Sequence, residues 1–261
     1  YAEAHNTLGN TLKELGKLEE AEASFRQAIA LKSDFPEAQS NLGVTLQELG
    51  RLDETEASLR QAIALKPDFA EAHSNMGVAL QKLGRLEDAE ASLKQAMALK
   101  PDFAEAHLNL GITLQELGRL DEAESSLRQA IALKPDYAEA NYSLALFFSQ
   151  VNEYEKAAEL FGSSDFKDSK SYLLKCLYKL DVQSRFFDEL DYLIHQGEIN
   201  SIIGSLGCRS TLKYGLERPN LFCKDPLKYV LHTDLKSQYD FKAIFVEKAR
   251  AILNGNTISD R

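Results

Sequence analysis

The chain has 261 residues, of which 44% are hydrophobic, and it carries 40 Asp and Glu against 30 Lys and Arg. This composition is typical of a globular chain, and no run approaches the roughly 18 consecutive apolar residues that would indicate a membrane-spanning helix. Residues 1–137 hold 23 acidic against 14 basic side chains; we therefore expect no nucleic acid and no membrane as partner, and favour a neutral or basic protein or peptide.

The dominant pattern is a repeat of 34 residues. Four blocks superimpose when the sequence is shifted by this period: 2–35, 36–69, 70–103 and 104–137. A fixed period of this length predicts stacked structural units, because each unit leaves apolar surface uncovered until a neighbour packs on it.

Each block predicts two helices. In the second block, Ala38, Leu42 and Leu46 recur every three or four positions, which places them on one helical face. Gly50 is predicted to end this helix in the left-handed conformation, which costs glycine no steric penalty.

The second helix of this block has its apolar face between Thr55 and Leu65, and Pro67 ends it. Asp53 is predicted to cap this helix at its N-terminus. Asp68 is predicted to cap the first helix of the next block in the same way.

This pattern resembles the tetratricopeptide repeat family. The residues that carry the resemblance in the second block are Leu42, Gly43, Leu46, Gly50, Ala62 and Pro67, and those in the third are Met76, Gly77, Leu80, Gly84, Ala89, Ala96 and Pro101. The small residues at Gly43 and Ala62 indicate close helix packing. The resemblance implies an all-α fold, a right-handed α-solenoid of antiparallel helix pairs with a divergent helical C-terminal cap.

The repeat pattern decays after residue 137. We assign residues 1–166 to the repeat array, with a partial repeat at 138–166. Residues 167–261 are interpreted as a degenerate repeat from Leu173 to Gly197, followed by helical segments around 198–214 and 239–253 and a loop containing Pro219 and Pro226. A terminal cap with a polar outer face is the favoured role of 167–261, and a connector into a further domain is the alternative.

The first residue and the cysteines bear on the origin of the chain and on its cellular compartment. Tyr1 stands one residue before the first block and is not Met, so we expect a fragment of a longer protein. Cys176, Cys208 and Cys223 are an odd, sparse set without a CxxC pair, which predicts small buried thiols in a reducing, cytoplasmic compartment.

A concave groove is the expected binding site. In the tetratricopeptide family the first helices line such a groove, and the residue before the Leu-Gly pair points into it; here these positions are Thr7, Asn41, Asn75, Asn109 and Ser143. The three asparagines resemble the asparagine ladder of the repeat domain of O-linked N-acetylglucosamine transferase, which implies hydrogen bonds from their amides to the backbone of an extended peptide. The alternative is that these amides satisfy the backbone of a neighbouring repeat.

Other side chains must add to such a ladder. Three hydrogen bonds at about 1 kcal/mol each fall short of the roughly 8 kcal/mol of a micromolar complex. The expected contributors are Gln47, Gln81, Gln115, Val44, Val78 and Ile112. This mixture of amide and apolar surface predicts sequence-tolerant binding of extended segments.

No catalytic chemistry is predicted, and we expect no metal and no cofactor. His5, His73 and His107 recur at equivalent positions, but adjacent repeats hold them too far apart to share a zinc ion. We interpret them as replacements for an aromatic packing residue. Phosphate-loop, GxSxG and HExxH motifs are absent from the sequence, and the HxD at 232–234 lacks room for the second histidine of an oxygenase site.

Three functions follow from this pattern. The favoured one is a scaffold that binds extended polypeptide in its concave groove. The second is the substrate-recruiting arm of a transferase or oxygenase whose catalytic domain is absent, since the ALKPDFAEAH linkers and the segment RPNLFCKDPLKYVLHTDL resemble cyanobacterial multidomain proteins with that order of domains. The third is a self-assembly module that stacks through exposed terminal hairpins.

Overall fold

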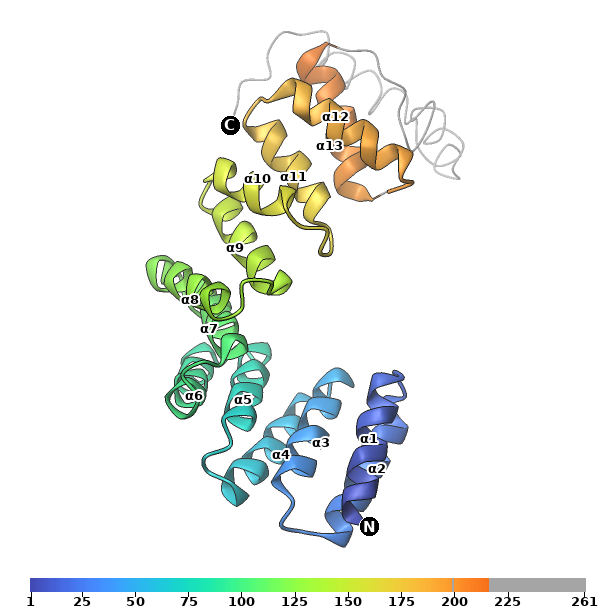
Figure 1. Ribbon diagram of the computed structural model, residues 1–261, viewed down its shortest axis with the longest axis vertical. Coiled ribbons are helices and arrows are strands. Elements are labelled where there is room, and N and C mark those ends of the chain that lie inside the picture. The colour runs from blue at the N-terminus through green and yellow to red at the C-terminus, as the bar shows by residue number, and fades with distance from the viewer. Residues whose placement is uncertain (199, 216–261) are drawn as a thin grey trace, which may run out of the picture. The chain divides into compact units, whose positions relative to one another are not determined.

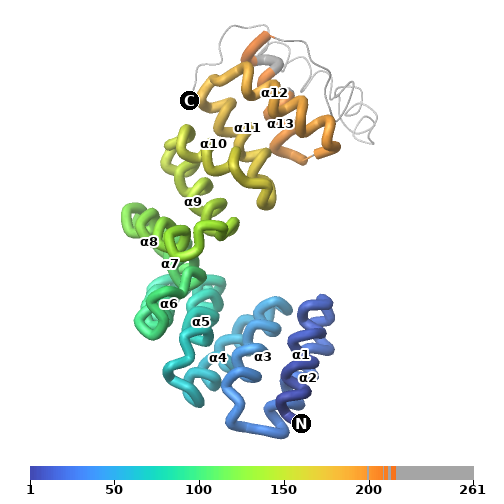
Figure 2. Tube along the Cα trace, in the orientation of Figure 1, coloured from blue at the N-terminus to red at the C-terminus, as the bar shows by residue number. Residues whose placement is uncertain are grey.

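Helical hairpins follow one another along the chain, as the ribbon and the trace show (Figure 1, Figure 2). The computed structural model describes residues 1–198 and 200–215, and within these residues every regular element is an α-helix. The predicted all-α helical repeat fold is confirmed for this part of the chain. Two compact units divide the chain, unit 1 at Tyr1–Phe166 and unit 2 at Lys167–Arg261.

Unit 1 contains five hairpins. Their helices are α1 (Ala2–Glu14) and α2 (Leu18–Leu31), α3 (Pro36–Glu48) and α4 (Leu52–Leu65), α5 (Ala70–Lys82) and α6 (Leu86–Leu99), α7 (Ala104–Glu116) and α8 (Leu120–Leu133), and α9 (Ala138–Gln150) and α10 (Tyr154–Gly162). The first four hairpins coincide with the four predicted blocks. In the fifth, α10 has 9 residues whereas α8 has 14.

Three helices are described in unit 2: α11 (Ser169–Lys179), α12 (Gln183–His195) and α13 (Ser201–Tyr214). The helix α11 packs against both α12 and α13. The segments predicted at 239–253 and around Pro219, and the HxD at 232–234, lie outside the described residues. The interpretation of 167–261 as a cap or connector stays a prediction.

A glycine in the left-handed conformation joins the two helices of each of the first four hairpins, and Asn152 takes this conformation in the fifth. Gly50 has φ +77°, and its N–H donates to the carbonyl oxygen of Gln47 at 3.0 Å, while the N–H of Arg51 donates to Leu46 at 2.9 Å. This pair of hydrogen bonds satisfies carbonyls that the helix end would otherwise leave unpaired. The predicted role of Gly50 is confirmed.

The predicted aspartate caps are wrong. The helix α4 begins at Leu52 with Arg51 as its N-cap residue, and α5 begins after Phe69; neither N-terminus has a side-chain cap hydrogen bond. After Gly50 only Arg51 precedes α4, so the chain is already helical when it reaches Asp53. The Asp53 carboxylate instead lies in the first turn, where it interacts favourably with the helix dipole.

Small residues allow the two helices of a hairpin to touch. A Cβ atom placed on Gly43 would lie 2.8 Å from Cγ of Leu59, and one on Gly77 would lie 2.5 Å from Cγ of Leu93. Leu59 and Leu93 are fully buried. The close approach expected from the glycine of the Leu-Gly pair is confirmed, because the leucine of the second helix fills the space that a Cβ would need.

Apolar clusters join neighbouring repeats. One cluster combines Leu59 of α4 with Met76, Ala79 and Leu80 of α5 and Ala89 of α6, all of them buried. A second cluster, with Phe25 of α2 against Leu42 and Leu46 of α3, joins the first two repeats in the same way. The core is therefore a continuous row of similar interfaces, in which each hairpin depends on its immediate neighbours.

Ion pairs repeat along the second helices. Arg51 contacts Glu22 of the preceding repeat at 2.7 Å and Glu54 of its own repeat at 2.5 Å. The equivalent contacts are Arg85 with Glu56 and Asp88, and Arg119 with Glu90 and Glu122. Single exposed pairs contribute little to stability, but this one recurs at three successive junctions and fixes the same orientation of each repeat on the next.

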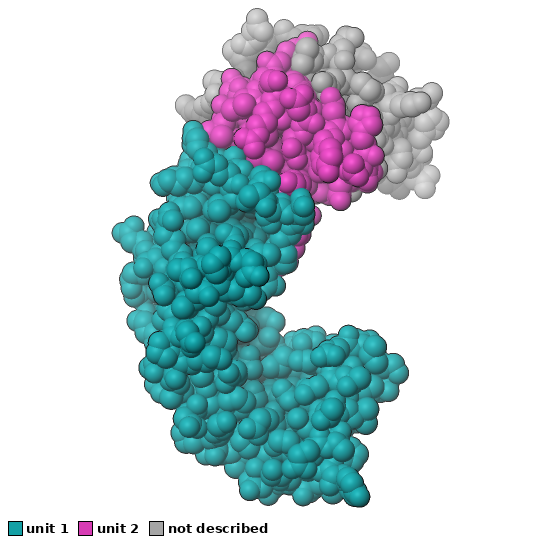
Figure 3. All heavy atoms as spheres, in the orientation of Figure 1, with its two compact units in different colours: residues 1–166 teal, residues 167–261 magenta. Residues whose placement is uncertain are grey.

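Unit 1 is curved. The first helices of neighbouring repeats pack against one another, from α1 on α3 to α7 on α9, and they lie closer together than the second helices do. The more closely packed helices occupy the inside of a curve, and the atoms of unit 1 bend around a hollow (Figure 3). We call the accessible side chains of α1, α3, α5, α7 and α9 the inner surface.

Candidate functional site

All the predicted binding residues lie on the helices of the inner surface. They are Thr7 on α1; Asn41, Val44 and Gln47 on α3; Asn75, Val78 and Gln81 on α5; Asn109, Ile112 and Gln115 on α7; and Ser143 on α9. Thr7 is exposed and the others are half-buried. Their accessibility follows from their place opposite the buried leucines of the same helices.

Two of the three asparagines contact the preceding repeat. The amide nitrogen of Asn41 donates to Oδ1 of Asn6 at 3.0 Å, and that of Asn75 donates to Oγ of Ser40 at 3.4 Å. The acceptor is a side chain in both cases, whereas we expected backbone if the asparagines served a neighbouring repeat. Part of the hydrogen-bonding capacity of these amides is therefore used within the array, and their contact with a peptide backbone stays a prediction.

The predicted glutamines also link repeats. Nε2 of Gln81 donates to the carboxylate of Glu116 at 2.8 Å, and Nε2 of Gln115 donates to Oε1 of Gln150. Both bonds run from one first helix to the next. They hold the side chains of the inner surface in position before any ligand arrives, which reduces the entropy lost on binding.

A pocket lies on the inner surface between α7 and α9. Its volume is about 300 Å³, and it is lined by Ile112, Gln115, Glu116, Ser143, Leu146 and Gln150. The structure thus brings three predicted residues, Ile112, Gln115 and Ser143, into one site. The sequence analysis missed Glu116, Leu146 and Gln150, although Leu146 follows Ile112 by one period and Gln150 follows Glu116 by one period.

The inner surface is acidic. Its five helices carry eight glutamates, namely Glu3, Glu14, Glu37, Glu48, Glu71, Glu105, Glu116 and Glu139, and two lysines, Lys13 and Lys82. Such an excess of one sign in a concave surface strengthens the local potential and attracts cationic groups.

A row of glutamates near the starts of the first helices is only partly neutralised. Lys66 contacts Glu37 at 3.7 Å and Lys100 contacts Glu71 at 3.1 Å. Like Lys66 and Lys100, the equivalent Lys134 lies over the aromatic ring three residues later, but within the described residues it forms no ion pair with Glu105.

The electrostatic consequence appears in the pKa values. Partial desolvation by neighbouring atoms, together with the charges of Glu139 and Glu71, raises the pKa of the exposed Glu105 above its ordinary value. The pKa of Glu71 is lowered instead, because a backbone hydrogen bond and the nearby Lys100 outweigh the opposing effect of burial. Burial and the charges of Glu105 and Glu139 raise the pKa of Tyr137 to about 12. Negative charge is therefore least compensated around α7 and α9.

The repeated histidines hold the turns between repeats. Nε2 of His73 lies 2.9 Å from the carbonyl oxygen of Pro67, and Nε2 of His107 lies 3.2 Å from that of Pro101. Asn141 donates to Pro135 from the equivalent position at 3.3 Å. Among the described residues no three His, Cys, Asp or Glu side chains form a group that could hold a metal ion.

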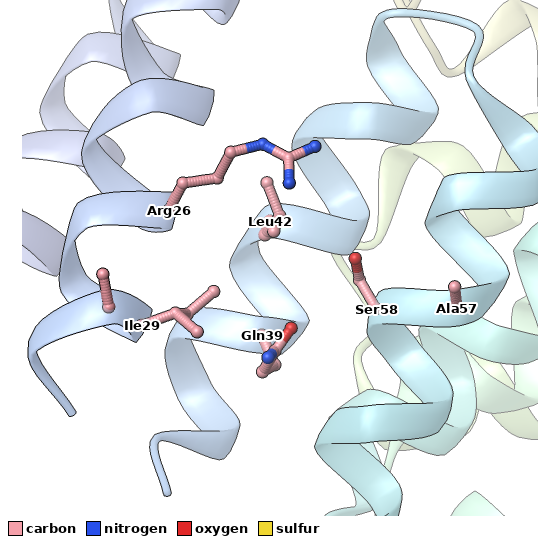
Figure 4. A pocket seen from close by; sticks show the side chains of 7 residues that line it. Arg26, Ile29, Gln39, Leu42, Ala57 and Ser58 are labelled. Carbon is pink, nitrogen blue, oxygen red and sulfur yellow. The ribbon is translucent and has the colours of Figure 1, made fainter. Parts of the chain in front are cut away.

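A second pocket, of about 390 Å³, lies between the second helices α2 and α4. Arg26 and Ile29 of α2, Gln39 and Leu42 of α3, and Ser58 of α4 surround it (Figure 4). Arg26 also pairs with Glu54 of α4 at 3.3 Å. This ion pair connects the two helices beside the pocket.

None of the described helices is both long enough and apolar enough to span a bilayer.

Comparison with solved structures identifies similar folds. PilW, described as a widely conserved type IV pilus biogenesis factor, is 22% identical with a TM-score of 0.72, over 78% of this chain and 97% of that one. PilF of Pseudomonas aeruginosa is 18% identical with a TM-score of 0.67, over 80% and 97%. A thermophilic tetratricopeptide protein of Thermus thermophilus, TTC0263, is 27% identical with a TM-score of 0.58, over 73% and 99%.

The sequence comparisons agree with the fold. No curated protein matches the chain. Family models described as TPR repeat match residues 9–50 and 48–84, and others described as tetratricopeptide repeat match 68–136 and 114–172. Together these matches run without interruption over more than half of the 261 residues. Through this segment the chain belongs to the tetratricopeptide repeat family.

Proposed function

We propose that this chain is a non-catalytic protein-interaction module that binds extended, neutral or basic polypeptide along the inner surface of unit 1. The observation that carries the proposal is the excess of glutamates over lysines on the five helices of that surface. The half-buried Val44, Val78 and Ile112 lie between these charges and supply apolar contact area. An acidic, partly apolar concave surface suits a cationic chain with aliphatic side chains.

The proposal is tested by placing positive charge on the inner surface. In the variant with Val44→Lys and Val78→Lys, basic peptides from an array of random peptides should be retained at least about tenfold less than by the wild-type chain, because like charges in the groove repel them. The matched control carries Ala57→Lys and Ala91→Lys, at exposed positions of α4 and α6. Equal binding by the inner-surface variant and the wild type would refute the proposal, and loss in the control alone would move the site to the second helices.

A second function, self-association, is favoured by one observation. Leu8 of α1 is 48% exposed, whereas the equivalent Leu42 and Leu110 are each 4% exposed because a preceding repeat covers them. We propose that a further helical hairpin covers this face and that a second copy of the chain can supply it. Sedimentation velocity over a concentration series should show a dimer that Leu8→Glu converts to a monomer. A wild-type monomer at all concentrations would refute this function. The recruiting arm of an enzyme stays a prediction from the sequence.

A further inference from the structure

The pocket between α7 and α9 differs from the equivalent places in earlier repeats. Ser143 occupies the position at which the preceding repeat has Asn109, and the smaller side chain leaves more room. Leu146 has a larger apolar side chain than the valines at its position in the second and third repeats. Glu116 stands where the second repeat has Glu48 and the third repeat has Lys82, so the carboxylate distinguishes this pocket from the third repeat alone. These changes together produce an apolar depression with an acidic wall.

The size and the walls of the pocket suit a side chain rather than a metabolite. Its volume of about 300 Å³ is at the lower end of the roughly 300–1,000 Å³ typical of small-molecule sites. Ile112 and Leu146, one from each helix, supply the apolar contact. The hydrogen bond from Gln115 to Gln150 connects the same two helices, so the pocket exists before a ligand binds.

The charges on α7 and α9 indicate which residues of a bound segment would flank the side chain in the pocket. The helices α7 and α9 carry Glu105, Glu116 and Glu139 and contain neither Lys nor Arg. Within the described residues none of these carboxylates has an ion-pair partner; Glu116 accepts a hydrogen bond only from the neutral amide of Gln81. Glu116 is the carboxylate among the lining residues, so a cationic group of a bound segment beside the pocket would meet a carboxylate without an internal ion-pair partner.

We infer that the α7–α9 pocket holds one aliphatic side chain of the bound segment, and that a lysine or arginine flanking that side chain pairs with Glu116. This inference rests on the proposed function and makes it more specific. The extended segment would be anchored at α7 and α9, while the rest of the inner surface contacts it with less discrimination.

The test uses fluorescent peptides of Gly, Ser and Asn that contain one central Leu flanked by one Lys, with binding measured by fluorescence anisotropy. Replacing the peptide Leu by Ala should weaken binding to the wild-type chain roughly tenfold, as expected for an aliphatic group in an apolar pocket. In the Leu146→Ala variant the same replacement should have less than about a threefold effect, because the pocket no longer contacts the larger group. Val44→Ala, at the equivalent position of α3, is the matched control and should retain the full effect.

The charge is tested by an exchange. Glu116→Lys should weaken binding of the Lys peptide and strengthen binding of a peptide with Glu in place of Lys. Glu48→Lys, at the equivalent position of α3, should not reverse the preference for the Lys peptide over the Glu peptide. Equal effects of the peptide change on wild type and Leu146→Ala, no reversal by Glu116→Lys, or no preference of the wild type for the Leu/Lys peptide would each overturn the inference. The proposed function would survive these results if basic peptides still bound less to the Val44→Lys and Val78→Lys variant than to the Ala57→Lys and Ala91→Lys control.

Discussion

At Gly77 two effects of a methyl group oppose each other. Alanine is favoured over glycine inside a helix by about 1 kcal/mol. A Cβ atom at this position, however, would lie 2.5 Å from Cγ of Leu93 and 3.2 Å from the backbone oxygen of Ala89. Leu93 is fully buried, so it cannot move without displacing its neighbours. Overpacking of this kind costs roughly 1–3 kcal/mol, and the steric effect outweighs the helix propensity.

Gly77→Ala should therefore lower the free energy of unfolding by about 1–2 kcal/mol in urea titrations. In the background of Leu93→Ala, which removes the obstructing side chain, the same change should become neutral or stabilising. Gly84→Ala is the control: no atom lies within 4 Å of its added Cβ, and its φ of +74° makes alanine unfavourable in both backgrounds. Additive effects of Gly77→Ala and Leu93→Ala would contradict the packing explanation.

A carboxylate with a raised pKa destabilises the fold when it ionises. Because the pKa of Glu105 is higher in the folded than in the unfolded chain, this group favours folding at low pH and opposes it as the pH rises through its folded pKa. Glu105→Gln should raise the free energy of unfolding at pH 7. The gain should be less than about 1 kcal/mol, because the side chain is exposed to solvent. The gain should vanish below the ordinary pKa of a glutamate.

Glu71→Gln should have the opposite effect. The pKa of Glu71 is lowered in the folded chain, so its stabilisation is present at neutral pH and is lost as the pH falls through the folded pKa. The opposite effects of the two variants on stability are measured by unfolding curves of both variants and the wild type between pH 3 and pH 8. A loss of stability at pH 7 in Glu105→Gln would show that its charge is compensated after all.

The sequence predicts the positions of the inner-surface residues better than their contacts. A period of 34 places Asn41 and Asn75 in register, but their acceptors lie 35 residues earlier, at Asn6 and Ser40. That offset depends on how one helix is rotated against the next, which no single block determines. The α7–α9 pocket likewise depends on Ser143 and Leu146, where the fifth repeat departs from the pattern that the other blocks establish.

Among the elements, hairpin boundaries were predictable because glycine and proline restrict the backbone locally, whereas the helix N-termini were not. Asp53 has the residue type and spacing of a cap, yet the glycine turn brings the chain into the helix one residue before it. In unit 2, by contrast, the N-terminus of α13 has a side-chain cap. Asn200 has extended backbone and its side chain accepts hydrogen bonds from the N–H groups of Ile202 and Ile203 at 3.1 and 3.0 Å.

Replacing Asn200 and Asp53 by alanine should distinguish a residue that caps a helix from one that does not. Asn200→Ala should destabilise α13 by about 1 kcal/mol, because it leaves backbone donors of the first turn without their acceptor. Asp53→Ala should cost less than about 0.5 kcal/mol, since only a favourable interaction with the helix dipole is lost. Amide hydrogen exchange in the first turn of each helix measures both effects. A larger loss of protection in α4 than in α13 would contradict the assignment of the caps.

For the molecule as a whole, stability is expected to be a sum over adjacent interfaces. Leu59 contributes to its own hairpin through Gly43 and to the next through the cluster with Met76 and Leu80. A single truncation there removes contacts from two repeats at once, while repeats farther along the array keep all of theirs.

Leu59→Ala should therefore cost roughly 2–5 kcal/mol, and the loss should be local. Amide exchange should accelerate most in α3 to α6, less in α7 and α8, and not at all in α11 and α12. Leu99→Ala, at a position 36% exposed, is the control and should change exchange little. Uniform acceleration across the whole chain would show that the array unfolds as one cooperative block.

The recurring junctions have a consequence for how such a gene can change. If residues 70–103 were deleted in frame, Leu110 would meet the surface that now receives Met76, and Arg119 would take the place of Arg85 beside Glu56. The new junction would keep the same kinds of contact, with Leu110 for Met76 and Thr113 for Ala79, and duplication of the same stretch would also join matching blocks. Unequal recombination between blocks can therefore shorten or lengthen the inner surface in steps of one hairpin, so that the length of this surface can evolve separately from foldability.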